Sequence, residues 1–220
     1  MLYEDADVIV VDKPCGLLTM GTDRDKSRTA HSILNDYVRK GNPKSRNRVY
    51  IVHRLDRDTS GILLFAKSEL AKLFLQSDWD NTTKTYLTVV FGHIDPPSGT
   101  ISSYLAENAA LKVYSTPDPS RGKLSHTAYS LIKEQKGFSL LQIQLLTGRK
   151  HQIRVHFAER GHAVVGDRKY AAGHASHPNL ALHARSIEFT HPVSGNRLHF
   201  ETLTPALFSR LVGAFELPVK

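Results

Sequence analysis

The feature that most constrains the fold is a change in hydrophobic period at Lys84. Before it, short apolar runs predict buried strands, and residues 30–39 predict an amphipathic helix. After it, apolar and polar residues alternate, as in residues 86–91, which is typical of half-buried strands. A chain that mixes helices and strands and ends in a strand-rich half is predicted to be α+β.

The remaining elements follow from the same patterns. The early strands are expected at residues 8–11, 49–52 and 62–66, and the late ones at 100–104, 127–132, 138–146 and 197–202. The helix at residues 30–39 is expected to face inward through Ala30, Ile33, Leu34, Tyr37 and Val38, and to stop at residues 40–43. Three further helices are expected: one capped by Ser68 with Leu70, Leu73 and Phe74 inward, one at about 149–160, and one from Pro205 capped by Thr204.

The chain reads as one domain over residues 1–220, because no repeat or linker-like tract divides it. Its apolar runs are too short to span a bilayer. Cys15 is the one cysteine, which excludes an internal disulfide framework and is typical of a reducing cytosol. A cytoplasmic protein is expected, with a monomer as the default state.

The charge balance indicates a polyanionic partner. Lysine and arginine number 29 against 21 acidic residues, which gives a net charge of +8. Basic side chains that neutralise phosphates release counterions, so RNA or DNA is favoured over a membrane surface. The basic segment 40–48 is a possible RNA-contacting loop, although a solvated connector is an equally good interpretation.

The densest polar cluster is residues 53–61, HRLDRDTSG, between two apolar strands. Functional residues collect on such loops because the neighbouring strands hold them in place. Taken alone, however, the cluster favours a salt-bridged turn in which Thr59, Ser60 and Gly61 only supply the turn geometry.

A second polar cluster is residues 146–156. Arg149 and Lys150 are expected in the first turn of a helix, where a cation opposes the helix dipole and calls for a compensating anion. That anion is either a carboxylate, with Asp56 the obvious candidate, or a phosphate. An equally good interpretation is that both side chains extend into water and need no partner. His151 and His156 are five residues apart and do not share a helical face, and His174 and His177 lack ligand partners at suitable spacing, so no metal is expected. The sequence contains neither a Walker motif nor GxGxxG, so no nucleotide cofactor is expected.

The ordered motifs resemble the RluA-type family of RNA pseudouridine synthases. Residues 53–61 match the family signature at every fixed position. The other matching segments are residues 12–17 (DKPCGL), 84–86 (KTY), 147–154 (TGRKHQIR), 166–170 (GDRKY) and 182–184 (LHA). Each string is short, but together they occur in the family's order along nearly the whole chain.

The resemblance implies a curved, mostly antiparallel mixed sheet flanked by helices and loops, with a central RNA-binding cleft. It implies catalysis by Asp56, with Arg149 as its ion-pair partner and Tyr86 stacked on the target uracil. Ile153 would belong to the apolar pocket, and Arg54 would help displace the base. We also expect RNA contacts from His53, Arg57 and Lys150. Many relatives carry a small N-terminal RNA-binding module that this chain lacks, so target selection is expected from the catalytic domain.

The expected partner is structured RNA, a stem-loop of large-subunit ribosomal RNA or transfer RNA. Two alternatives remain open at this point. One is an RNA-binding or folding module in which catalysis is dispensable, although such a module would be expected to have lost Asp56, Tyr86 or Arg149. The other is a metal-independent nuclease that uses His53 and Asp56 and would cut the strand instead of isomerising a base.

Overall fold

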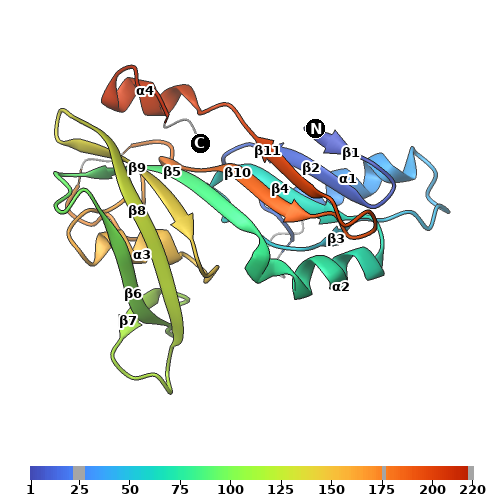
Figure 1. Cartoon of the computed structure of the whole chain (residues 1–220), viewed down its shortest axis with the longest axis horizontal. Coiled ribbons are helices and arrows are strands. Elements are labelled where there is room, and N and C mark those ends of the chain that lie inside the picture. Colours follow the sequence, from blue (N-terminus) through green and yellow to red (C-terminus); the bar gives the residue numbers. More distant parts are fainter. Residues whose placement is uncertain (22–27, 175–176, 218–220) are drawn as a thin grey trace. The chain divides into compact units, whose positions relative to one another are not determined.

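The computed structural model describes residues 1–21, 28–174 and 177–217 (Figure 1). Two compact units are present. Unit 1 comprises residues 1–83 and 184–202, and unit 2 comprises residues 84–183 and 203–220. The boundary at Lys84 is the position where the hydrophobic period changes. Helices and antiparallel strands confirm the α+β prediction.

Unit 1 is a sheet with helices. Its elements are β1 (Tyr3–Glu4), β2 (Val8–Lys13), α1 (Ala30–Arg39), β3 (Tyr50–Ile51), β4 (Ser60–Ala66), α2 (Glu69–Ser77), η1 (Trp79–Asn81), most of β10 (Leu182–Thr190) and β11 (Arg197–Glu201). The strand order is β1-β2-β4-β10, with β11 on β10 and β3 on β4. Strands β2 and β4 are antiparallel, and Val10 lies opposite Leu64. Both residues are fully buried, which places the core beneath these two strands.

Helix α1 has the predicted bounds and stops as expected. Lys40 caps its C-terminus in the left-handed conformation, and Thr29 caps its N-terminus. Ala30, Leu34 and Val38 are buried as predicted. Tyr37 is 51% exposed, and its hydroxyl donates a hydrogen bond to Glu4 (2.8 Å), so the prediction that it faces inward was wrong.

Helix α2 presents a different face from the predicted one. Ser68 caps it as expected, accepting a hydrogen bond from the Ala71 amide (3.1 Å). The buried residues are Ala71 and Leu75, whereas Leu70, Leu73 and Phe74 are 80%, 53% and 37% exposed. The prediction for these three residues was wrong, because a stripe of apolar residues at helical spacing does not by itself show which stripe contacts the sheet.

Unit 2 is dominated by long antiparallel strands. Its elements are β5 (Thr83–Phe91), β6 (Ser98–Glu107), β7 (Val113–Thr116), β8 (Lys123–Gln135), β9 (Phe138–Leu145), α3 (Gln152–Ala158) and α4 (Ala206–Val212). The strand order is β5-β9-β8-β6-β7. A hairpin at Lys136 and Gly137 joins β8 to β9, and both residues have positive φ. Phe208 and Val212 of α4 pack on Leu87, Val89 and Leu140 of the sheet.

Several predicted boundaries need correction. Strands β7 and β10 were not anticipated. Helix α3 begins at Gln152, so Arg149 and Lys150 precede the helix instead of lying in its first turn. Helix α4 has Pro205, not Thr204, at its N-cap and no side-chain cap. Within the residues described, no helix is long and apolar enough to cross a membrane.

Candidate active site

The loop that carries Asp56 is fixed by a buried threonine. Thr19 is 3% exposed, and its hydroxyl donates to the Leu55 carbonyl (2.9 Å) while accepting from the Leu55 amide (3.1 Å). Leu55 itself is buried, whereas Asp56 is half-buried and Arg54 is exposed. The main chain is therefore anchored one residue before the carboxylate.

A buried lysine fixes the same loop from its other side. The Lys13 ammonium donates to the carbonyl oxygens of Leu17 (2.7 Å), Arg57 (3.0 Å) and Pro14 (3.1 Å). An ammonium has three N–H donors, so each has an acceptor. The Arg57 carbonyl also accepts from the Gly16 amide (3.0 Å). The Lys13 ammonium thus joins the turn around Gly16 to the residue that follows Asp56.

Burial lowers the pKa of Lys13 to about 8, against opposing contributions from Cys15, Asp58 and Asp56. The side chain is 1% exposed. Desolvation disfavours the ammonium, and the three carbonyl dipoles compensate for only part of that cost.

At the end of the loop, Gly61 of β4 lies very close to Ala184 of β10. Gly61 has φ +108°, and a Cβ atom there would lie 2.2 Å from the Ala184 carbonyl oxygen. Only glycine fits this position, which explains the glycine that closes the motif. The Thr59 amide donates to the Asp56 carbonyl (3.3 Å), which forms the turn that leads into β4.

His53 faces the interior of unit 1. Its Nε2 accepts a hydrogen bond from the Leu64 amide (3.0 Å), and its ring lies 4.7 Å from that of Trp79. Arg57 and Asp58 are exposed on the same loop. The geometry gives His53 a structural contact, and an RNA contact from it remains a prediction.

In unit 2, Tyr86 and Ile153 lie in the core. Tyr86 is on β5, 8% exposed and opposite Ile143 of β9. Ile153 is on α3 and 3% exposed. Residues 83–91 place Tyr86 on a strand whose neighbours are almost all buried, which gives its ring a rigid support.

The turn that carries Arg149 is held by one buried glutamine. Gln152, 2% exposed, accepts hydrogen bonds from the Arg149 amide (3.0 Å) and the Thr147 hydroxyl (2.9 Å) at Oε1. Its amide nitrogen donates to the His126 carbonyl (3.0 Å) and the Thr127 hydroxyl (2.9 Å). The Arg149 main chain is therefore tied to β8, while its side chain is exposed.

Lys150 and His151 fix the same turn from other directions. Lys150 forms an ion pair with Glu107, so this carboxylate supplies an anion that the sequence did not identify. His151 adopts a left-handed conformation (φ 54°), and its Nδ1 lies 2.7 Å from the Tyr170 hydroxyl. That contact joins two of the segments that match the family, residues 147–154 and residues 166–170.

A buried ion pair completes that junction. Arg154 donates to both oxygens of Asp167 (2.7 and 2.9 Å). Burial raises the pKa of Asp167, but the hydrogen bonds from Arg154 and the amides of Lys169 and Tyr170 lower it more, so it lies below its usual value. Such bidentate pairing fixes geometry as well as charge.

Three positioning residues were missed from sequence: Lys13, Thr19 and Gln152. Gln152 carries a signal, because it opens a helix whose residues 152–157 are buried, whereas Lys13 carries none, because it lies between exposed Asp12 and Pro14. Thr19 carries none, since its partner Leu55 is 36 positions away.

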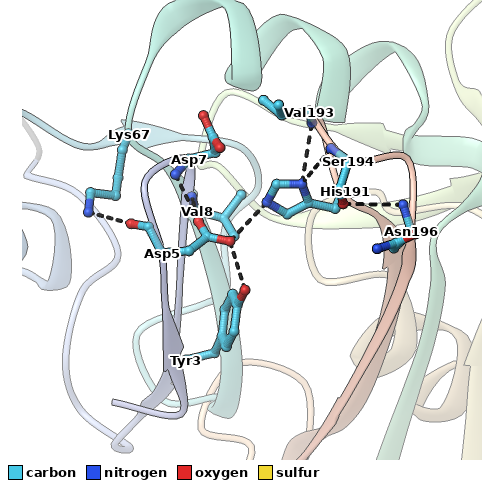
Figure 2. A network of polar contacts seen from close by, with 9 residues as sticks. All are labelled: Tyr3, Asp5, Asp7, Val8, Lys67, His191, Val193, Ser194 and Asn196. Carbon is cyan, nitrogen blue, oxygen red and sulfur yellow. Dashed lines mark hydrogen bonds and ion pairs between the residues drawn. The ribbon is translucent and has the colours of Figure 1, made fainter.

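A separate polar cluster in unit 1 was also not anticipated (Figure 2). Potential ligand atoms of Asp5, Asp7 and His191 lie within 4.8 Å of one another. His191 Nδ1 accepts from the amides of Val193 (3.3 Å) and Ser194 (3.1 Å), which leaves Nε2–H to donate to Asp5 (2.9 Å).

The Asp5 carboxylate is equally engaged. It accepts from the amides of Asp7 and Val8 and from the Tyr3 hydroxyl, each at 2.8 Å. Burial raises the pKa of Asp5, but the Val8 and Asp7 amides and the Tyr3 hydroxyl bring it below its usual value. A cation would have to displace these hydrogen bonds, so we interpret the cluster as a structural network that joins the β1–β2 turn to the β10–β11 turn.

The structure thus groups the predicted site residues in two sets. Unit 1 holds His53, Arg54, Asp56 and Arg57 on one loop. Unit 2 holds Tyr86, Arg149, Lys150 and Ile153. The pairing of Asp56 with Arg149 joins residues of different units and remains a prediction.

Comparison with known proteins finds RNA pseudouridine synthases, both by family model and by sequence identity. A family model described as RNA pseudouridylate synthase matches residues 7–159. A Mycoplasma pneumoniae protein described as an uncharacterized RNA pseudouridine synthase is 34% identical over 95% of this chain and 68% of its own length. A protein of Mycobacterium tuberculosis with the same description is 35% identical over 94% of this chain and 69% of its own.

Two solved human structures share the fold. The protein titled RNA Pseudouridylate Synthase Domain Containing 4 has a TM-score of 0.82 at 20% identity and covers 99% of this chain and 94% of its own. Domain Containing 1 has a TM-score of 0.75 at 25% identity, over 99% of this chain and 89% of its own.

Proposed function

The chain belongs to the RNA pseudouridylate synthase family, and from this membership we propose that it isomerises specific uridines in stem-loops of large-subunit ribosomal RNA or transfer RNA. It is an isomerase that converts uridine to pseudouridine in RNA. The family match over residues 7–159 carries the proposal, because this range contains Asp56, Tyr86, Arg149 and Ile153. Ribosomal RNA is our preferred substrate.

Asp56 is the proposed catalytic carboxylate. The reaction breaks the bond between N1 of uracil and the ribose, turns the base and joins C5 to the same carbon, after which C5 loses its proton. A carboxylate can attack the sugar or the base, or take a ribose proton, and can later take part in removing the C5 proton. The half-buried position of Asp56 beside the anchored Leu55 supports this role. No step of this chemistry calls for a cofactor or a metal.

Tyr86, Arg149 and Ile153 supply the rest of the proposed site. Tyr86 offers a flat face for the uracil and a hydroxyl for proton transfer, and Ile153 supplies an apolar wall. Arg149 would keep Asp56 ionised and aimed. The hydrogen bonds of Gln152 support that role, because they fix the Arg149 main chain.

The remaining predicted residues would contact RNA. A uracil within a stem-loop must leave the stack to reach the site, which costs about a few kcal/mol. Arg54 is exposed and would help displace the base, and Arg57 is exposed beside it. RNA contacts from Lys150 and His53 also form part of the proposal, although each has a partner within the protein.

Tritium release tests the assignment. Transcripts of ribosomal and transfer RNA labelled with tritium at uracil C5 should lose tritium to water when the protein is added. Asp56→Asn should abolish release while leaving the thermal unfolding midpoint nearly unchanged. Asp58→Asn, at the exposed aspartate two residues later, is the matched control and should retain most activity.

Three outcomes are decisive. Unchanged release by Asp56→Asn would contradict the catalytic role of that residue. No release from any cellular RNA, with binding retained, would favour the alternative of an RNA-binding module, and strand cleavage would favour a nuclease.

Arg149→Ala distinguishes a positioning role from a phosphate contact. We expect a loss of kcat of roughly a hundredfold or more with little change in RNA affinity, because Asp56 would no longer be held in its reactive geometry. Arg160→Ala, at an exposed arginine of the same unit, should change neither. Equal losses of kcat and affinity would reassign Arg149 to phosphate binding.

The substrate itself is identified by mapping. Pseudouridines in total RNA from cells with and without the gene would show which uridines depend on this chain. Cytoplasmic location forms part of the proposal, because both candidate RNAs are found there and a chain with one cysteine, Cys15, has no internal disulfide.

A further inference from the structure

A polar surface pocket of unit 1 lies apart from the loop that carries Asp56. Its volume is about 350 Å³, within the range of small-ligand sites. Asn35, Asp36 and Arg39 of α1 form one side, and Arg48 and Val49 form the other. We propose that this pocket binds a phosphate of the RNA backbone through Arg39 and Arg48, as an anchoring site additional to the active site. The inference rests on the proposed function for the identity of the ligand.

The segment around the pocket has an unusual charge pattern. Residues 37–55 contain six lysines and arginines and no acidic residue. All six are exposed, and five of them, Arg39, Lys40, Lys44, Arg46 and Arg48, lie within ten residues of one another. Among the residues that the structure describes, no ion pair joins any of the five to a carboxylate. A cation cluster that the protein does not neutralise is typical of a surface that meets a polyanion.

The pocket is held rigid by side chains of α1. Asn35 accepts from the Val49 amide at Oδ1 (3.0 Å) and donates to the His31 carbonyl (2.9 Å). The ring of His31 contacts the Val49 carbonyl (3.1 Å). These bonds attach the main chain at Val49 to α1, so they also fix the main-chain position of the neighbouring Arg48.

Arg48 is oriented further by an aromatic ring. Its guanidinium carbon lies 5.4 Å from the centroid of the Tyr50 ring, within the range of a cation–π contact. A guanidinium stacked in this way keeps its N–H edge available to a phosphate, which it can bind through two parallel hydrogen bonds. Because the side chain is ordered before binding, less conformational entropy is lost when the phosphate arrives.

Neutralising Asp36 should affect RNA affinity in the opposite direction from neutralising the two arginines. It is an exposed carboxylate that lines the pocket together with Arg39 and Arg48. Within the part of the chain that the structure describes, Asp36 forms no ion pair with either arginine. If the pocket binds a phosphate, this carboxylate repels it, so neutralising Asp36 should tighten RNA binding. If the arginines serve only the fold, neutralising Asp36 should not affect RNA binding.

The test compares two variants of the full chain on the same RNA transcripts. Arg39→Gln/Arg48→Gln should raise Kd about tenfold and should reduce the slope of log K against log salt by about 0.7 to 0.9, the value for one phosphate contact. The kcat at saturating RNA should stay within about twofold of wild type, since neither residue lies on the Asp56 loop. Asp36→Asn should lower Kd by about two- to threefold.

Arg160→Gln/Arg210→Gln is the matched control. It removes the same charge at two exposed arginines outside the pocket, and we expect less than a twofold change in Kd. An equal loss in both double variants would show an effect of net charge and overturn the proposal, as would an unchanged or weaker affinity in Asp36→Asn.

The experiments can reject the phosphate-binding pocket without rejecting the proposed isomerase function, and the reverse. Kd and its salt slope are measured without turnover, so the pocket is tested even if no uridine is isomerised. Conversely, tritium release with unaltered binding by the pocket variants would keep the proposed function and reject the pocket.

Discussion

Among single residues, Lys13 shows how a buried charge can fix the loop that carries Asp56 at a cost in stability. Its ammonium is 1% exposed and donates to three carbonyls, one of them that of Arg57, directly after Asp56. The pKa in the folded protein is about 8, against 10.5 for the ordinary side chain. Folding therefore disfavours the charged form, and the cost is present at neutral pH.

This cost predicts a pH dependence of stability. A group with a folded pKa below its unfolded pKa binds fewer protons in the folded state, so the free energy of unfolding rises with pH between about 8 and 10.5. Relative to Lys13→Met, wild type should gain on the order of 3 kcal/mol across that window, measured by urea unfolding at a series of pH values. Lys123→Met, at an exposed lysine, should show no such difference. A constant difference between wild type and Lys13→Met would contradict the lowered pKa.

The sequence identifies the acidic and basic residues of the site more readily than the groups that hold them. Asp56 and Arg149 stand out because their motifs are dense in polar side chains. The partners of Lys13 are main-chain carbonyls, and any residue has one, so no pattern of side chains predicts that Leu17 and Arg57 converge on it.

Among the elements, α2 shows that helical periodicity identifies a helix before it identifies the buried face. Its N-cap at Ser68 was predicted, but its core contacts come from Ala71 and Leu75, and the helix packs against β4 and β3. Leu70 and Leu73 lie on the exposed side in the described structure.

Two truncations test this assignment. Leu75→Ala should destabilise the protein by about 2–5 kcal/mol, because it empties a buried site. Leu70→Ala removes the same atoms from an exposed position and should cost less than about 0.5 kcal/mol. Chemical unfolding measures both, and equal losses would mean that Leu70 is covered in solution.

The approach of β4 to β10 gives a second prediction at this scale. Gly61→Ala would place a Cβ atom 2.2 Å from the Ala184 carbonyl oxygen, against main chain that has no room to move. We expect a loss of roughly 3 kcal/mol or more, together with a loss of activity, since Gly61 ends the Asp56 loop.

Gly195→Ala separates the clash from backbone strain. Gly195 also has positive φ, but nothing lies within 4 Å of its would-be Cβ atom. Its substitution should cost only about 1 kcal/mol. If both alanine variants lose equal stability in thermal unfolding, the close approach at Ala184 has no energetic effect.

For the whole molecule, the excess of basic residues predicts electrostatic binding. A net charge of +8 should make RNA affinity fall steeply with salt, by roughly 10³-fold or more between about 50 and 200 mM if six or more phosphates are contacted. Filter binding over a salt series measures the slope. A flat response would contradict phosphate contacts of any kind.

The α+β class was predictable from the change of period at Lys84, and this is also where the two units divide. What the periodicity did not reveal is that β10 and β11 return to the sheet that contains β2 and β4. Such a return depends on pairing between residues more than a hundred positions apart, for which a single sequence carries no signal.

That return has a consequence for the order of events on the ribosome. Strand β10 lies next to β4 (Figure 1), yet the intervening chain of unit 2 is translated between them. His191, which closes the network around Asp5, emerges later still. Unit 1 therefore waits for nearly the whole chain to be synthesised, and its unfinished sheet edge at β4 is exposed in the meantime to chaperones, proteases and other nascent chains.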